Sequence, residues 1–412
     1  MRPAIGHRVF LHIGLHKSGT TFLQNVCRAN RDGLAAQGIH FPGGKGRPNH
    51  TFAVYDLFGR RPRGSEDDRI SGQWDAITHD ILESSSPTSL ISEEALSLAS
   101  PAQARKAVRS FADAEVHVVV TARDLGRVAL SAWQEDIKTD QTWIWRAYAD
   151  ALADHGARGQ SPARGFWLRQ DLPAVLAIWA GVVPSERVHV VTVPPPGADA
   201  AILLQRMGEV VGFDGSSLGE PGRWDNTSMG VAGTEVLRRM NVHLHRRLNQ
   251  RQYHDVVETV LAPILARDPA AIRLSVPESD RHWIDREAAS IIVSVREAGY
   301  HVVGDLEDLR PVYVEGGRAP DAVDTGELLD AAVLALAGLT ERFALAKWSR
   351  RKDSARITDA PTAARAGSAV RATWFKGKRA AVNLADRNQV AAGGLGAFLR
   401  ARNSLARRRA ER

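Results

Sequence analysis

The stretch VFLHIGLHKSGTTF, from Val9 to Phe22, decides the fold of this chain. Its first part, Val9–Gly14, is an apolar run rich in β-branched residues, a pattern typical of a strand buried on both faces of a parallel sheet. A loop with two glycines follows, and from Thr20 onward the apolar residues take helical spacing. A strand, a glycine-containing loop and a helix in this order predict the start of a βαβ unit.

The residues of this loop point to a phosphate or sulfate ligand. Gly14 and Gly19 allow tight turns, and the backbone amides at the start of the following helix would face an anion. Lys17 adds a positive charge, and Thr20 and Thr21 add hydroxyl groups. The order differs from the nucleotide-binding loop G-x-x-x-x-G-K-[ST], because the lysine precedes the second glycine. The alternative is an ordinary strand-to-helix turn that contains a lysine.

The rest of the chain predicts a doubly wound α/β fold, in which a parallel sheet with a P-loop-like phosphate-binding loop is flanked by helices. Further strands are expected at Thr88–Ser92, Val116–Thr121 and Val188–Val193, and helices at Thr20–Asn30, Pro101–Ala112, Leu125–Lys138 and Leu172–Ala180. Residues 229–345 have mostly helical patterns. They are expected to cover one face of the sheet or to form a helical lobe.

The composition excludes collagen-like, coiled-coil and wholly disordered chains, because 44% of the 412 residues are hydrophobic and 25% are charged. The net charge of +7 is uneven: residues 350–412 hold 16 Lys or Arg against 4 Asp or Glu, whereas residues 1–349 hold 38 against 43. Few large apolar residues follow Trp348, so this part cannot offset its ordering entropy by burial. We therefore expect one α/β domain over 1–345 and a disordered basic tail over 346–412, with at most a short helix near Leu395–Arg407.

Cysteine use and hydropathy indicate a cytoplasmic protein. The single Cys27 cannot form an internal disulfide, so nothing depends on an oxidising compartment. No apolar run reaches the roughly 18–20 residues that cross a bilayer, and Met1–Val9 lacks the apolar core of a signal peptide. A transmembrane segment is therefore not expected.

In this loop the sequence resembles the sulfotransferases that use 3′-phosphoadenosine 5′-phosphosulfate (PAPS), especially bacterial and actinobacterial ones. In that family, K-[ST]-G-T-T after a strand is the loop that binds the 5′-phosphosulfate, and Lys17 to Thr21 read Lys-Ser-Gly-Thr-Thr. The resemblance implies a PAPS donor and 3′,5′-ADP as product, with no metal expected. The cofactor-binding residues expected in this loop are His16, Lys17, Ser18, Gly19, Thr20 and Thr21.

A second segment strengthens the resemblance. Residues 117–138 read HVVVTARDLGRVALSAWQEDIK, with Arg123 at the end of the expected strand and Ser131 eight residues later. This looks like the family's motif for the 3′-phosphate of the donor, in which arginine supplies a permanently charged fork and serine a hydroxyl group. By itself, an Arg-Asp pair at a strand end is often a surface salt bridge.

Four further segments look like the same family in the same order, so the resemblance covers about residues 8–315. They are Leu90–Leu96, Phe166–Pro196, Asp225–Asn241 and Gly299–Pro311. The implied acceptor is a hydroxyl or amine on a small molecule, glycan or lipid. No specific nucleic-acid partner is expected, and the tail is expected to have at most a weak attraction to anionic surfaces.

Sulfuryl transfer needs charge stabilisation and a base. Lys17 is the expected stabiliser of the bridging oxygen. Glu94 is the first choice for the base, since carboxylates in a similar place act so in heparan-type sulfotransferases; its neighbour Glu93 should point the other way. Alternatively, Glu93 and Glu94 have no catalytic role and are the first residues of a helix, where carboxylates interact favourably with the helix dipole. His50 and His16 are the other candidates, and the alternative for His50 is a solvated loop histidine.

Two other functions stay open at this point. The same fold supports a P-loop kinase-like phosphotransferase, against which the reversed glycine–lysine order argues. A noncatalytic nucleotide- or anion-binding protein is the other alternative.

Three aromatic residues have two interpretations. Either they form a wall of the acceptor site or they are part of the core: Trp143, Trp145 and Tyr148.

Overall fold

The computed structural model describes residues 6–44, 46, 48–60, 68–111, 113–219, 228–244, 247–313 and 315–357. The chain divides into two units, Met1–Leu339 and Thr340–Arg412. Residues 346–357 belong to helix α15 (Thr325–Ile357). Residues 358–412, with most of the expected basic tail and its expected short helix, lie outside the described residues.

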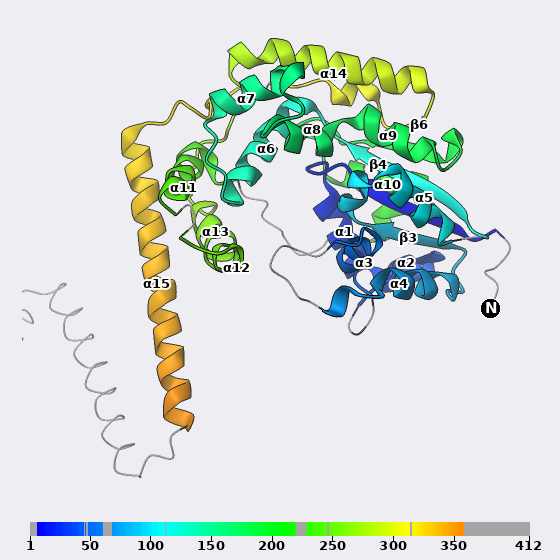
Figure 1. Ribbon diagram of the computed structural model, residues 1–412, viewed down its shortest axis with the longest axis horizontal. Helices are drawn as coiled ribbons and strands as arrows, with labels where there is room; N and C mark the ends of the chain where they lie inside the picture. The colour runs from blue at the N-terminus through cyan, green and yellow to red at the C-terminus, as the bar shows by residue number, and fades with distance from the viewer. Residues whose placement is uncertain are drawn as a thin grey trace, which may run out of the picture. The chain divides into compact units, whose positions relative to one another are not determined.

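A six-stranded sheet forms the centre of the first unit (Figure 1). All neighbouring strands are parallel, in the order β2-β3-β1-β4-β5-β6. The strands are β1 (Arg8–Gly14), β2 (Ile39–His40), β3 (Thr88–Ser92), β4 (Glu115–Ala122), β5 (Val188–Thr192) and β6 (His301–Val303). The predicted α/β fold around a parallel sheet is confirmed.

The four expected strands are present, and two short edge strands were not predicted. With two and three residues, β2 and β6 are too short for a periodic pattern. β1 lies between β3 and β4, and the chain visits strands on both sides of it. In parallel sheets, ligands bind beyond the carboxyl ends of the strands at such a switch point. The loop after β1 therefore lies where this fold binds ligands.

Helices connect the strands, as the alternating pattern predicts. They are α1 (Thr20–Ala29), α2 (Arg31–Ala36), α3 (His50–Leu57), α4 (Gln73–Leu82), α5 (Pro101–Arg109), α6 (Leu125–Lys138), α7 (Trp145–Ala153), α8 (Ala163–Gln170), α9 (Leu172–Ala180), α10 (Ala201–Val211), α11 (Gly230–Leu244), α12 (Gln250–Tyr253), α13 (Ala262–Leu265), α14 (Glu278–Ala298) and α15. Shorter helical turns are η1 (Asp68–Ile70), η2 (Glu94–Leu98), η3 (His155–Ala157), η4 (Ser185–Arg187), η5 (Gly215–Ser217), η6 (His254–Leu261) and η7 (Leu306–Leu309).

Different helices cover the two faces of the sheet. Because successive side chains of a strand point to opposite faces, neighbouring residues of β1 pack against different helices. On β1, Val9, Leu11 and Ile13 pack with apolar residues of α3, α4, α5, α9 and α14. Phe10 points to the other face and packs with α1, α2 and α10. The sheet is thus buried on both sides, which explains the nearly unbroken apolar runs of its central strands.

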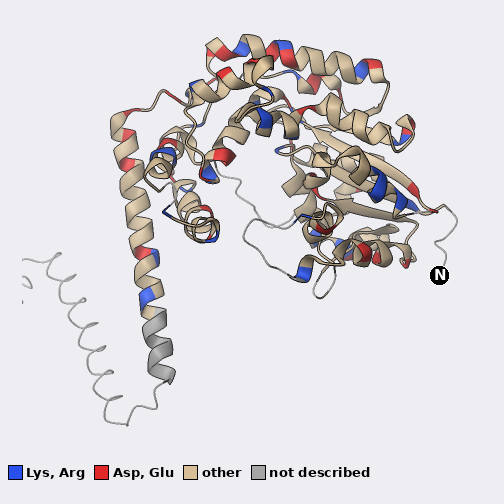
Figure 2. Ribbon diagram, viewed as in Figure 1, with Lys and Arg blue, Asp and Glu red and all other residues tan. Residues whose placement is uncertain are grey.

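A third apolar core lies away from the sheet. It consists of residues from α6, α7, α8, α11, α13, α14 and the start of α15 and contains no strand residue. Of the two arrangements expected for residues 229–345, most of this region therefore forms a helical lobe. Along α14, basic and acidic residues are interspersed on the outside (Figure 2). Among the residues that the structure describes, no helix combines the length and apolarity needed to span a bilayer.

Candidate functional site

The loop between β1 and α1 has an unusual backbone. Gly14, Lys17 and Gly19 all have positive φ, at 84°, 63° and 83°. Glycine adopts this conformation without steric cost, whereas lysine does so rarely. A Cβ at Gly14 would come within 2.8 Å of the Glu94 Cβ, so the chain needs glycine there for space as well. The backbone at Lys17 is strained, a state that proteins concentrate at functional sites.

A buried hydrogen-bond chain supports the loop from below. The Ser92 hydroxyl lies 2.7 Å from Nδ1 of His12, and Nε2 of His12 lies 3.1 Å from Oγ1 of Thr121. Thr121 Oγ1 lies 2.7 Å from the Ser18 hydroxyl, which donates to the Leu15 carbonyl. Complete burial lowers the pKa of His12 to about 4, so its ring is neutral and donates from one nitrogen while accepting at the other.

The sequence predicts that Ser18 binds the cofactor, whereas in the structure the Ser18 hydroxyl belongs to this buried hydrogen-bond chain. Its side chain is buried and bonds within the loop, so its hydroxyl holds the loop in shape. His12, which the sequence analysis did not single out, connects strands β3 and β4 to the loop through Ser92 and Thr121. Its only signal in the sequence is a polar residue inside an apolar strand.

The start of α1 offers backbone donors that the helix itself does not use. Gly19 is the N-cap residue and has no side chain to accept a hydrogen bond. The amides of Thr20, Thr21 and Phe22 lie in the first turn, where a helix supplies no acceptor. Thr20 is buried and Thr21 is exposed. Donors of this kind, together with the positive end of the helix dipole, favour an anion.

Lys17 forms an ion pair across the loop. Its ammonium lies 2.8 Å from Oε2 of Glu135, which is on α6. Lys138, one turn further along α6, lies 3.9 Å from the same carboxylate. Ser131 precedes Glu135 by four residues and so shares its face of the helix. The face of α6 that carries Ser131 is thus turned toward the loop.

Arg123 follows β4 directly and is mostly buried beside the loop. Its Nη1 donates to the Lys17 carbonyl at 3.3 Å, and its Nε has no hydrogen-bond partner among the described residues. Burial and the nearby Arg127 lower the pKa of Arg123 to about 10. The adjacent Asp124 caps α6 and bonds to Arg127 instead. Arg123 is therefore a mostly buried cation that no carboxylate of the described residues neutralises by an ion pair.

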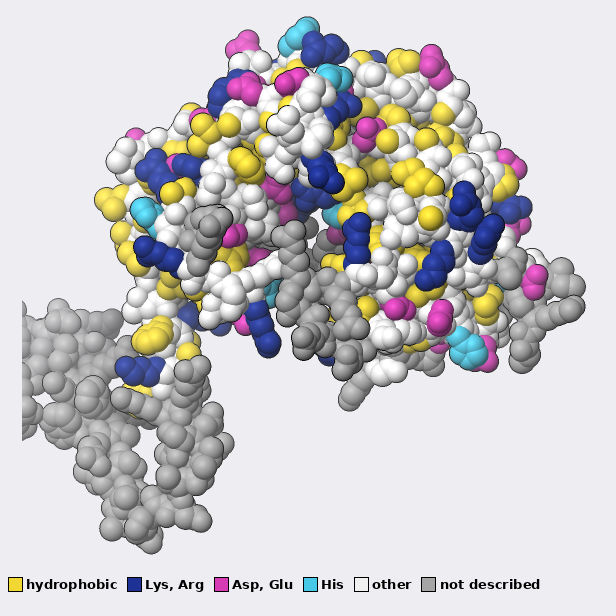
Figure 3. All heavy atoms as spheres, viewed as in Figure 1, with side chains coloured by type: hydrophobic (Ala, Val, Ile, Leu, Met, Phe, Trp, Pro, Cys, Tyr) yellow, Lys and Arg dark blue, Asp and Glu magenta, His cyan; other side chains and the backbone are white. Residues whose placement is uncertain are grey.

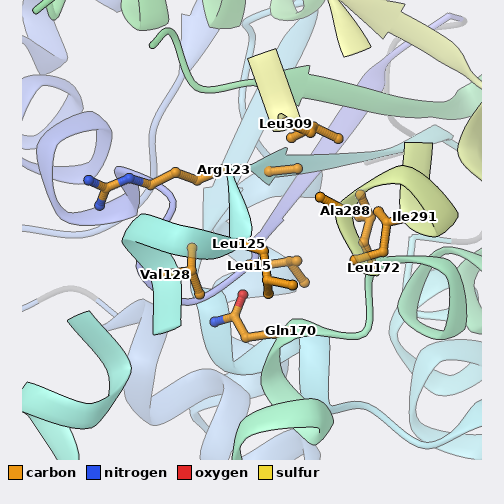
Figure 4. A pocket seen from close by; sticks show the side chains of 10 residues that line it. Leu15, Arg123, Leu125, Val128, Gln170, Leu172, Ala288, Ile291 and Leu309 are labelled. Carbon is orange, nitrogen blue, oxygen red and sulfur yellow. The ribbon is translucent and has the colours of Figure 1, made fainter. Parts of the chain in front are cut away.

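A small cavity lies next to Arg123. It measures about 20 Å³ and is lined by Leu15, Arg123, Gln170 and apolar residues of α6, α9 and α14. This is room for roughly one water molecule. Figure 4 shows the Arg123 guanidinium extending away from the apolar side chains of the cavity. The cavity itself is thus too small for a nucleotide, and the charged end of Arg123 points elsewhere.

The two expected carboxylates reach different elements. Glu94 Oε2 accepts a hydrogen bond from Gln24 of α1 at 3.2 Å, and its Cβ borders Gly14. Glu93 is buried, accepts from Thr51 of α3 at 2.6 Å, and caps η2 through the Ala95 amide. Burial raises the pKa of Glu93. Glu94 therefore lies beside the loop, whereas Glu93 holds α3 and η2 in place.

Neither histidine candidate is solvated. His50 is not an exposed loop residue: it begins α3, is 7% exposed, and bonds through both ring nitrogens to backbone groups of Pro42 and Ser92. His16 lies inside the loop, and its Nδ1 is buried without a hydrogen-bond partner in the described part of the chain. Burial lowers the pKa of both rings to about 4. At neutral pH both are uncharged.

The residues around the site include several that the sequence analysis did not predict. Glu135 pairs with Lys17, and Gln170 of α8 donates to the His16 carbonyl at 2.8 Å. Arg169 pairs with Asp136 at 3.2 Å. Basic and acidic side chains gather in the recess between the helices and the sheet in the space-filling view (Figure 3). Trp145 and Tyr148 are core residues of the helical lobe.

No group of three or more His, Cys, Asp or Glu among the described residues is arranged to hold a metal ion.

No protein-family model matches the sequence, and no curated protein matches it. The structure is similar to that of a sulfotransferase from Alicyclobacillus acidocaldarius, with a TM-score of 0.36 and 14% sequence identity; the match covers 62% of this chain and 99% of that chain.

Proposed function

We propose that the chain is a sulfotransferase that moves a sulfuryl group from PAPS to a hydroxyl or amine of a small molecule, glycan or lipid. The observation that carries the proposal is Arg123, a mostly buried cation that pairs with no carboxylate of the described residues and lies beside a loop whose helix-start amides have no acceptor within the helix. An unpaired buried charge is costly, and an anionic ligand would remove that cost. A nucleotide with phosphates at both its 3′ and 5′ ends would use both features at once.

Each residue then has a chemical task. The amides at the start of α1 and the hydroxyls of Thr20 and Thr21 would hold the nonbridging oxygens of the 5′ end. Arg123 and Ser131 would hold the 3′-phosphate. PAPS would supply the activated sulfuryl group. Lys17 would stabilise the charge that develops on the bridging oxygen as the bond to sulfur breaks.

Glu94 is the proposed base for the acceptor. It lies beside Gly14 at the start of the loop, and its Oε2 bonds to Gln24 rather than to a cation. It would take the proton of the acceptor hydroxyl as the oxygen forms its bond to sulfur. His50 is a weaker proposal, since backbone groups occupy both ring nitrogens. Nδ1 of His16 has no hydrogen-bond partner among the described residues, but burial keeps the pKa of the ring low.

The setting of the reaction is also a proposal. We place the protein in the cytoplasm, because its single cysteine, Cys27, is buried and unpaired. The basic residues after residue 350 would attract anionic surfaces weakly.

Calorimetric titration with 3′,5′-ADP and with 5′-AMP tests the donor site. The wild-type protein should bind 3′,5′-ADP more tightly, because only this ligand has the 3′-phosphate. Arg123→Ala should weaken the binding of 3′,5′-ADP on the order of 10-fold or more, a typical effect of losing a charged hydrogen bond, and leave that of 5′-AMP nearly unchanged. Arg105→Ala on the exposed face of α5 is the matched control. Equal losses for both nucleotides would refute the role of Arg123.

The same titration separates the alternative functions. Binding of ATP that needs Mg²⁺, without binding of 3′,5′-ADP, would favour a phosphotransferase instead. Binding of 3′,5′-ADP without transfer of labelled sulfate to any acceptor in a broad screen would favour a noncatalytic binding protein.

A further inference from the structure

Lys17 is held at both its backbone and its side chain. Its carbonyl accepts from Arg123, and its ammonium lies 2.8 Å from Glu135. The pair is partly accessible, since the two side chains are 30% and 37% exposed. The Glu135 carboxylate is therefore already paired with the Lys17 ammonium, which the loop would otherwise offer to an anionic ligand. An incoming phosphate or sulfate has to share that cation with Glu135 or displace it.

Glu135 is surrounded mainly by positive groups. Lys17 of the loop and Lys138 of α6 lie closest, Arg169 of α8 is nearby, and Asp136 and His16 are the other titratable groups around it. Burial by itself would raise the pKa of Glu135, but the Lys17 ammonium outweighs it, with help from Lys138 and Arg169, and holds the pKa below its ordinary value. The ionised state of this carboxylate thus depends on Lys17.

We propose that Glu135 is a positioning residue of the anion site, which competes with the ligand anion for the ammonium of Lys17 and takes up a proton when the ligand takes that ammonium. The nature of the ligand, a 3′-phosphoadenosine nucleotide, rests on the proposed function. The competition itself rests only on the ion pair and on the amides of the first turn of α1, which have no acceptor within the helix.

Two effects of ligand binding act on Glu135 in the same direction. The favourable charge of Lys17 is then divided between two anions, and the ligand adds negative charge nearby. Both effects favour the protonated carboxyl group, as burial already does. Binding should therefore be accompanied by proton uptake at mildly acidic pH, and the competition should make binding weaker than it would be without the carboxylate.

Calorimetric titration with 3′,5′-ADP near pH 6, in two buffers of different ionisation enthalpy, measures affinity and proton uptake together. Glu135→Gln should bind roughly five-fold more tightly, the scale of a partly exposed ion pair, and should take up fewer protons than the wild type. The phosphates of the nucleotide also titrate near pH 6, so the comparison is repeated with inorganic sulfate, which does not. Glu209→Gln, the same substitution at an exposed carboxylate of α10, is the matched control. It should behave as the wild type.

Equal or weaker binding by Glu135→Gln, with unchanged proton uptake, would overturn the inference. Thermal unfolding of each variant shows whether it is folded; if Glu135→Gln is not, Glu135→Asp takes its place and should lie between the wild type and the expected value for glutamine. Failure of the wild type to bind 3′,5′-ADP would refute the proposed function instead. The same comparison with inorganic sulfate as the probe then still tests the competition for Lys17.

Discussion

Lys17 and Arg123 are two cations that the fold brings into contact but keeps in different environments. The ammonium of Lys17 is partly exposed and is paired with Glu135, whereas Arg123 is mostly buried and has no ion-pair partner among the described residues. Lysine is a mobile point charge, and arginine is a rigid fork that stays charged. Under the proposed function, this difference would suit Lys17 to the reacting end of the donor and Arg123 to its anchoring end.

Lys17→Ala should abolish sulfuryl transfer while the fold stays intact. The side chain is partly exposed, so under the proposed mechanism its loss would remove charge stabilisation at the bridging oxygen without opening the core. We expect a loss on the order of 100-fold or more in the transfer of labelled sulfate from PAPS to an acceptor found by screening. Lys106→Ala on the exposed side of α5 is the control. Undiminished turnover would remove Lys17 from the mechanism.

At the scale of elements, the loop after β1 depends on what lies against it. η2 packs against Gly14 through Glu94, β4 accepts a hydrogen bond from the Leu15 amide at the Thr121 carbonyl, at 2.6 Å, and α6 provides Glu135. These segments are far apart in the sequence, and the parallel sheet brings their ends to one edge. The positions of the site residues therefore depend on the contacts between these elements.

Gly14→Ala should destabilise the protein more than Gly72→Ala. Both glycines have positive φ, at 84° and 78°, which costs alanine roughly 1 kcal/mol in each case. Only at Gly14 would the new Cβ also meet Glu94, at 2.8 Å from Cβ and 3.2 Å from Cα, whereas nothing lies within 4 Å at Gly72. Urea unfolding should show an additional loss of about 1–3 kcal/mol for Gly14→Ala. Equal losses would mean that β1 and η2 move apart easily.

At the scale of the whole molecule, several buried histidines couple folding to pH. Burial lowers the pKa of His12, His50 and His189 to about 4, from 6.5 for an exposed histidine. Between these values the unfolded chain binds more protons than the folded one, so the free energy of unfolding falls as the pH drops from about 6.5 toward 4. Buried carboxyls with a raised pKa, such as Glu93, act in the opposite direction.

His50→Gln should reduce this pH dependence. The variant removes one buried group that titrates, while the amide still has a donor for the Pro42 carbonyl. Comparing the free energy of unfolding near pH 7 and near pH 5, we expect the difference to shrink by about 1–2 kcal/mol relative to the wild type. An unchanged difference would show that other groups dominate the acid sensitivity.

Truncation after Trp348 should leave nucleotide binding unchanged. All residues of the candidate site belong to the unit Met1–Leu339, and the removed segment begins in the second unit. Calorimetric titration of the truncated protein with 3′,5′-ADP should give the wild-type affinity. A large loss would mean that residues after 348 are part of the binding site.

The sequence by itself determined the four central strands, the loop and the order in which they occur. Val9–Gly14 is apolar enough to be recognised as a buried strand. The turn after it is recognised from Gly14, Lys17 and Gly19, because the properties of these residue types are local. For the same reason the ends of α6 and α9 agree with the expectation, since capping and periodicity are local properties. The short strands β2 and β6 carry too little pattern to be found in this way.

Only the tertiary structure decided which side chains meet at the loop. Glu135 lies 118 residues after Lys17, and its neighbours in the sequence give no sign of the ion pair. Likewise, the structure made His50 a buried partner of backbone groups and turned the Ser18 hydroxyl inward. These contacts arise because separate segments end at the same edge of the sheet, and their geometry depends on the packing of whole elements rather than on local residue spacing.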